Sequence, residues 1–186
     1  GLSGEEEVDG PLSESLKSRL PWLIVNLLTA FLASWVVSLF VGTIGKVVAL
    51  SSIMSIVTGM GGNAGAQSMT IIVRGIALDE VNRENGVRIF LKEFAVGILT
   101  GIVIGAIVAA VEAIVQGNPY LGLVTGLAMV LNMMAATATG YLVPVILKKL
   151  KIDPALASAV FVTTVTDVLG FFFFLGLATM FLPKLL

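Results

Sequence analysis

The chain contains no cysteine and no histidine, and it has few charged residues. Without cysteine it can form no disulfide bond and offer no thiolate to a metal, and without histidine it has neither imidazole ligands nor histidine-based catalysis. Any metal ion must therefore be bound through oxygen atoms. Oxygen ligands favour hard cations such as Mg²⁺, Ca²⁺ and Mn²⁺.

The scarcity of charge defines the class of protein. Only 12% of the 186 residues are charged and 57% are hydrophobic, with a net charge of −1. The mean hydropathy is +1.03. A soluble domain carries about 25% charged residues. The composition therefore predicts an all-α integral membrane protein in contact with lipid, and the absence of a basic stripe argues against a nucleic-acid partner.

The first twenty residues differ from the rest. Residues 1–10 are polar and acidic, which predicts a disordered linker. Residues 11–20 are expected to form a short amphipathic helix at the membrane surface, or to be the tail of a helix from a preceding domain. Residues 1–20 are thus predicted to be a linker region, followed by a membrane domain over 21–186.

Five apolar segments follow, each long enough to span a bilayer, which takes about 20 residues. They cover residues 21–41, 46–78, 94–115, 120–147 and 154–182, with a charged loop or surface helix at 79–93. The second segment is too long for a straight span, and four glycines lie within residues 59–65. We therefore expect this helix to break there and to expose backbone carbonyl groups.

Basic residues predict the orientation. Nine of the eleven lie on the side of the N-terminus if there are five spans, and two lie on the other side. We expect a multi-pass protein of the plasma (inner) membrane, with a cytoplasmic N-terminus and an extracytoplasmic C-terminus. The larger group is Lys17, Arg19, Arg74, Arg83, Arg88, Lys92, Lys148, Lys149 and Lys151, and the smaller is Lys46 and Lys184.

One carboxylate, Asp167, lies at the middle of the last apolar segment. An ionisable group at that depth is costly and indicates a functional site. Helical spacing places Ala159, Thr163 and Gly170 on the face of Asp167, with Thr166 beside it. No lysine or arginine lies at comparable depth, so we interpret Asp167 as a cation site. The alternative is a protonated aspartate hydrogen-bonded between helices.

The glycine-rich stretch is the second feature expected at mid-depth. Gly62, Asn63, Gly65 and Ala66 belong to it, and they are expected either to expose carbonyl groups to an ion or to allow close helix packing. Asn132 lies at a similar depth in the fourth segment and is interpreted as an interhelical hydrogen-bonding residue rather than a ligand.

Charge counting suggests a partner for Asp167. One carboxylate compensates a divalent ion poorly, whereas two copies in a two-fold dimer supply −2. Mg²⁺ usually keeps several of its waters. We therefore expect a wide, wet site in which two Asp167 carboxylates and backbone carbonyl groups hold a hydrated ion.

Three stretches carry a resemblance to a known family: PWLIVNLLTAFLAS at 21–34, GMGGNAGAQSMTIIVRGIAL at 59–78, and DPALAS with TTVTDVLG over 153–170. They resemble the transmembrane domain of the MgtE magnesium channels. The resemblance implies a homodimer with a central pore between the second and fifth segments, and it implies that Asp167 is the principal Mg²⁺ site. Gly62, Thr70, Thr163 and Thr166 match pore-lining positions. Full-length members also carry cytoplasmic Mg²⁺-sensing domains.

The sequence therefore predicts a Mg²⁺-selective channel and not an enzyme. The ion is expected at Asp167, Gly62 and Thr163, in a pore lined by Asn63, Gly65, Ala66, Thr70, Ala159, Thr166 and Gly170. Two alternatives remain. One is a transporter that couples a divalent cation to H⁺ or Na⁺, since an intramembrane carboxylate suits proton coupling. The other is a non-conducting assembly subunit, because Ala66 and Ala159 make the expected pore less polar.

Overall fold

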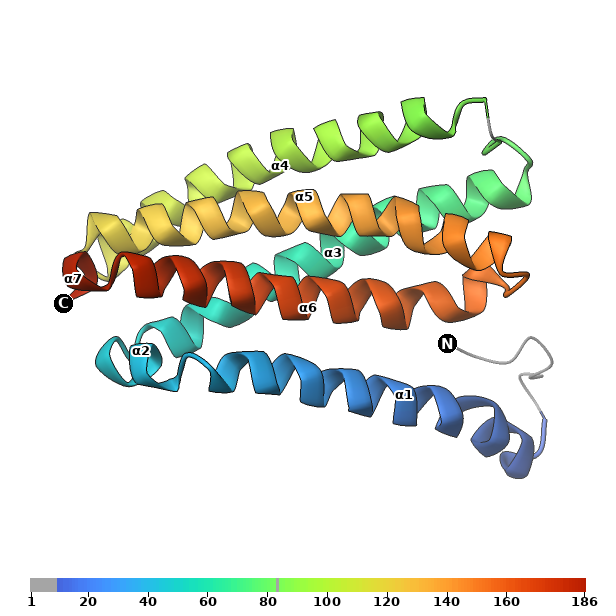
Figure 1. The fold of residues 1–186 in the computed structure, drawn as a ribbon, viewed down its shortest axis with the longest axis horizontal. Helices are drawn as coiled ribbons and strands as arrows, with labels where there is room; N and C mark the ends of the chain where they lie inside the picture. The colour runs from blue at the N-terminus through green and yellow to red at the C-terminus, as the bar shows by residue number, and fades with distance from the viewer. Residues whose placement is uncertain (1–9, 83) are drawn as a thin grey trace.

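The computed structural model describes residues 10–82 and 84–186, without the side chains of residues 156 and 157. The predicted linker over residues 1–9 and Arg83 lie outside the described residues. The described residues are helical throughout, apart from short connections (Figure 1). The helices are α1 (Leu12–Ser38), α2 (Val41–Lys46), α3 (Leu50–Ala77), α4 (Gly86–Val115), α5 (Pro119–Lys149), α6 (Pro154–Met180) and α7 (Leu182–Leu185).

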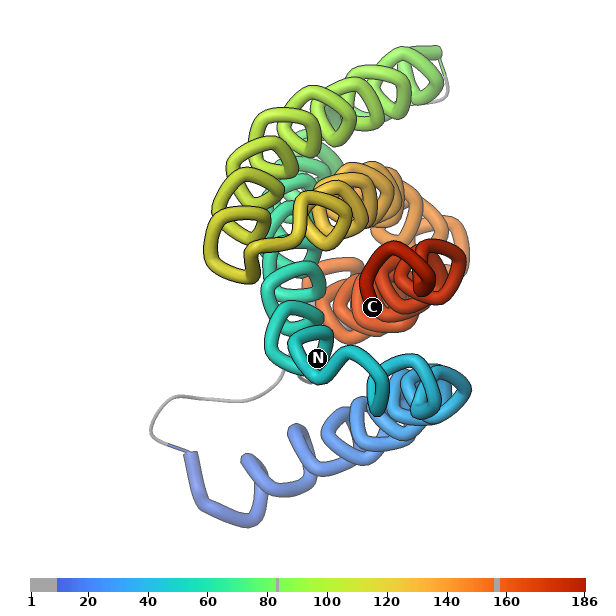
Figure 2. Tube along the Cα trace, turned by 90° about the vertical axis from the view of Figure 1, so that its left-hand side faces the viewer, coloured from blue at the N-terminus to red at the C-terminus, as the bar shows by residue number. Residues whose placement is uncertain are grey.

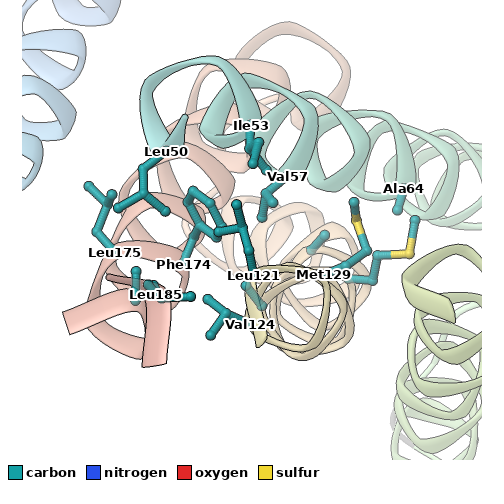
Figure 3. Close-up of a cluster of buried hydrophobic side chains, with 14 residues drawn as sticks. Leu50, Ile53, Val57, Ala64, Leu121, Val124, Met129, Phe174, Leu175 and Leu185 are labelled. Carbon is teal, nitrogen blue, oxygen red and sulfur yellow. The ribbon is translucent and has the colours of Figure 1, made fainter. Parts of the chain in front are cut away.

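Helix α5 is the centre of the bundle. It packs against α3, α4 and α6, whereas α1 packs mainly against α6. Figure 2 shows α4 and α1 on opposite sides of this arrangement. A cluster of buried apolar side chains packs α3, α5 and α6 together toward the end of the bundle near α2 and α7 (Figure 3). Its fully buried members include Leu50, Val57, Met129, Phe174 and Leu175.

The outer helices expose long apolar side chains, as a lipid-facing surface requires. Leu23, Leu28 and Phe31 on α1, and Leu99 and Ile107 on α4, are all more than half exposed. Within the residues that the structure describes, four helices are long and apolar enough to cross a membrane: Leu12–Ser38, Gly86–Val115, Pro119–Lys149 and Ser158–Met180. The prediction of an all-α membrane protein is confirmed.

Helix α3 has the length of a span but not the apolar composition of the other four. Its direction nevertheless fits a fifth pass, because it runs diagonally from the end with α2 to the opposite end (Figure 1). The fifth span therefore stays a prediction that the topology supports. The polar residues around Asn63 are the reason for its lower hydropathy.

The expected break at residues 59–65 is wrong, because α3 is one continuous helix from Leu50 to Ala77. The glycines fit neighbouring helices instead. A methyl group on Gly65 would lie 2.6 Å from Cγ1 of Val162, and one on Gly140 would lie 2.7 Å from the carbonyl oxygen of Gly65. Close packing against α5 and α6 therefore outweighs the low helix propensity of glycine, and the extra length is accommodated by tilt.

Two helix starts also differ from the predictions. Residues 12–20 are the first turns of α1 rather than a separate surface helix, since the helix continues through Pro21. Helix α4 begins at Gly86 rather than at residue 94. Arg88, Lys92 and Glu93 are thus helical. Arg88 and Lys92 are exposed near the end of the bundle, where long side chains can reach water, whereas Glu93 is buried.

The connections between the helices lie at the two ends of the bundle, in the two groups that the distribution of basic residues predicts. Lys148 lies 3.8 Å from a carboxylate oxygen of Asp79, which joins the connection after α3 to the end of α5. At the other end, Asn118 donates to the carbonyl oxygen of Lys184 at 3.2 Å. α1 therefore begins at the more basic end, and the chain finishes at the other (Figure 1).

Candidate cation site

Asp167 lies on α6 and is half-buried in this chain. Within the described residues, its carboxylate has no ion pair and accepts no hydrogen bond from a side chain or cap. An intramembrane carboxylate without a positive partner needs water, a proton or a cation to stabilise it.

A close crossing of α3 and α6 lies next to Asp167. A methyl group on Gly62 would be 3.9 Å from Oγ1 of Thr166, and one on Gly65 would be 3.6 Å from its Cγ2. Thr166 is fully buried. Two glycines on α3 therefore let this helix approach α6 at the residue that precedes Asp167.

Asn132 of α5 packs against both α3 and α6 beside this crossing. It is fully buried, and its Nδ2 donates to the carbonyl oxygen of Val57 at 2.9 Å. Its amide fills the space that side chains at Gly61 and Gly170 would need. The interpretation of Asn132 as an interhelical hydrogen-bonding residue is confirmed. Its Oδ1 has no hydrogen-bond partner within the described residues.

The threonines of α6 direct their hydroxyl hydrogens to backbone oxygens. Thr163 donates to the carbonyl oxygen of Ala159 at 2.9 Å, and Thr166 donates to that of Thr163 at 3.0 Å. The oxygen lone pairs of these hydroxyl groups therefore remain free to accept. Thr163, which is exposed, can accept hydrogen bonds from water molecules one turn before Asp167.

The predicted site residues fall into three groups by exposure. Gly62 and Asp167 are half-buried, and Gly65, Thr166 and Gly170 are buried within the chain. The buried group shapes the crossing, so it contributes to packing rather than to a surface of this chain. The exposed group, which remains free to line a watery path, consists of Asn63, Ala66, Thr70, Ala159 and Thr163.

The crossing therefore brings Gly62 and Gly65 of α3 against Thr166, the residue before Asp167, whereas Gly170 packs against Asn132 and Thr58. Asn63 differs from these residues. Together with Gln67, it lines a cavity between α3, α4 and α5. In the described part of the chain, no group of three or more Asp or Glu side chains could hold a metal ion. One chain thus supplies a single carboxylate here.

Sequence reasoning missed the burial of a carboxylate on α4, that of Glu93. It is 3% exposed and accepts a hydrogen bond from Ser68 at 2.7 Å. Its other carboxylate oxygen, Oε1, lies 3.4 Å from Nζ of Lys92. A signal was available, because Glu93 continues by one four-residue step the buried glycine stripe of Gly97, Gly101 and Gly105.

Known proteins resemble this chain over most of its length. The MgtE family, described as a divalent cation transporter, matches residues 54–177. The magnesium transporter MgtE of Bacillus subtilis is 39% identical over 90% of this chain and 37% of its own length. That of Enterococcus faecalis is 35% identical over 98% and 40%.

The magnesium transporter MgtE of Thermus thermophilus is 34% identical over 93% of this chain and 38% of its own length. The chain thus spans about two fifths of the curated relatives that it matches. The family match covers most of the chain, including the α3–α6 crossing and Asp167. This chain therefore belongs to the MgtE family of divalent cation transporters.

Proposed function

We propose that two copies of this chain form a channel for hydrated Mg²⁺ in the plasma (inner) membrane, with Asp167 of each copy facing a shared axis. The single observation that carries the proposal is the half-buried carboxylate of Asp167, which lies beside the close α3–α6 crossing and has no positive partner among the described residues. The names of the relatives support Mg²⁺ as the transported ion.

The outer face of α3 supports a second copy as the partner. Gly59, Asn63, Ala66, Gln67 and Thr70 are all exposed on it, although they lie within the length of a membrane helix, and Asn63 and Gln67 also border the cavity between α3, α4 and α5. Polar side chains facing lipid are costly, so this face needs water or another protein chain. A two-fold dimer places two such faces opposite each other and supplies both.

The charge of two Asp167 residues suits a divalent ion, and the chemistry of Mg²⁺ favours an ion that keeps its waters. Two Asp167 carboxylates supply a charge of −2, which balances one Mg²⁺. The ion loses its waters reluctantly, and exposed groups such as the Thr163 hydroxyl are suited to accept hydrogen bonds from those waters. The proposed orientation places the N-terminus in the cytoplasm, because the basic connections lie at that end.

The test is Mg²⁺ flux into sealed vesicles containing the purified chain. We expect flux that follows the Mg²⁺ gradient and does not change when a pH or Na⁺ gradient is imposed. Flux that requires either gradient would replace the channel with a coupled transporter. No flux above that of empty vesicles would favour an assembly subunit, which binds its copy without conducting.

A further inference from the structure

A cavity that Asp167 does not line contains the buried carboxylate of Glu93. It has a volume of about 330 Å³ and lies between α3, α4 and α5. Liquid water takes about 30 Å³ per molecule, so the cavity has room for an ion with part of its hydration shell. Glu93 lies on its wall, about 10 Å along α4 from the first residue of that helix.

The polar wall of this cavity consists largely of oxygen ligands. Oxygen-bearing side chains come from all three helices, and Thr100 and Thr137 use their hydroxyl hydrogens on backbone carbonyl groups of their own helices. Their lone pairs therefore remain available. These oxygen atoms suit hard cations, whereas the thioether groups of Met60 and Met133, which also line the cavity, do not. The oxygen-bearing side chains are Asn63, Gln67, Ser68, Glu93, Thr100 and Thr137.

The ion pair at Glu93 is loose. Nζ of Lys92 lies 3.4 Å from Oε1 of Glu93, which is longer than the 2.7–2.9 Å of a good charge-assisted hydrogen bond. Neighbouring residues on a helix do not face each other, so the lysine side chain must bend back to reach the carboxylate. That side chain is 64% exposed, against 4% for Glu93.

Charge decides which ion fits. Among the described residues that line the cavity, Glu93 and Lys92 are the only charged ones. If the ammonium group leaves, the cavity keeps a charge of −1, which one monovalent cation neutralises. A divalent cation would leave an excess positive charge in a partly buried space.

We propose that this cavity binds a monovalent alkali cation, which exchanges one for one with the Lys92 ammonium group. Glu93 supplies the charge, and the amide and hydroxyl oxygens of α3, α4 and α5 complete the coordination. The ammonium group of Lys92 competes with the cation for Glu93, and it occupies the opening of the cavity when no cation is bound. Each chain carries one such site, and cation binding there does not depend on whether the protein conducts Mg²⁺.

The test compares the thermal stability of the purified chain in NaCl, KCl and choline chloride at equal ionic strength. A cation that binds the folded state raises the melting temperature in a saturable way, whereas screening acts alike in all three salts. We expect NaCl or KCl to stabilise the wild type above choline chloride. The Lys92→Gln variant should need several-fold less cation for half the effect, because the competitor is gone.

Two variants separate a cation site from a structural ion pair. Glu93→Gln should raise the half-saturating concentration at least tenfold, and Asp167→Asn should leave it unchanged. If Glu93→Gln does not fold, the increase in affinity of Lys92→Gln carries the test alone. The same response in all three salts, unchanged affinity in Lys92→Gln, or saturation by MgCl₂ in preference to alkali cations would each overturn the proposal.

Discussion

Asp167→Asn is expected to lower Mg²⁺ flux by at least about tenfold, which corresponds to about 1.4 kcal/mol or more of lost stabilisation of the ion. The substitution keeps the shape of the side chain but removes its charge, and in a dimer it removes two charges from one axis. Asp167→Glu keeps the charge and should retain part of the flux. The measurement is the initial rate of Mg²⁺ entry into vesicles.

The matched control for this variant is Asp79→Asn. Asp79 is almost fully exposed at the end of the bundle, 3.8 Å from Lys148. Its φ of 57° lies in the left-handed region, which asparagine also tolerates. Flux should therefore stay at the wild-type level. Wild-type flux in Asp167→Asn as well would remove Asp167 from the transport path.

Gly140→Ala is expected to have the largest effect on folding. A methyl group at this position would lie 2.7 Å from the carbonyl oxygen of Gly65 and 3.0 Å from the backbone nitrogen of Met69. Both atoms belong to the backbone of α3, so relief requires the two helices to move apart. We expect a loss of about 1–3 kcal/mol in the free energy of unfolding, measured by denaturation in detergent.

Gly176→Ala is the control for this effect. It replaces a glycine within α6 that has nothing within 4 Å of an added methyl group. Alanine has the higher helix propensity, so stability should stay the same or rise by up to about 1 kcal/mol. Equal loss in both variants would mean that glycine acts here through the helix backbone alone and not through the contact of α3 with α5.

The helices and Asp167 were predictable because they depend on hydropathy and on a single charge. A long apolar segment can be recognised from hydropathy without knowledge of its neighbours. Asp167 is the one charged residue within the last such segment, whatever packs beside it.

The path of α3 was not predictable, because the same glycines favour a break in isolation and a close contact in a bundle. What decides between them is Asn132 filling the space beside Gly61, and Gly140 packing on Gly65. Both partners lie on α5, about seventy residues further along the chain. Residue-by-residue propensity carries no information on such pairs.

Glu93 was missed because its place depended on where α4 begins. The run of charges over residues 79–93 predicted a loop or a surface helix, so Glu93 was expected at an exposed end. With the helix starting at Gly86, the four-residue spacing from Gly97 places Glu93 on the packing face of α4. The error in the predicted start of α4 thus explains why Glu93 was expected to be exposed although it is buried.

The central claim is that two copies of the chain bring their Asp167 residues to one axis. Because the chain has no cysteine, Thr163→Cys and Leu99→Cys each create a single labelling position. Thr163 is exposed one turn before Asp167, and Leu99 is 65% exposed on α4. Distances between spin labels on two copies can be measured by pulsed electron paramagnetic resonance in the reconstituted protein. The intermolecular distance should be shorter for the Thr163→Cys label than for the Leu99→Cys label. No intermolecular coupling at Thr163, or a shorter distance at Leu99, would contradict the shared axis.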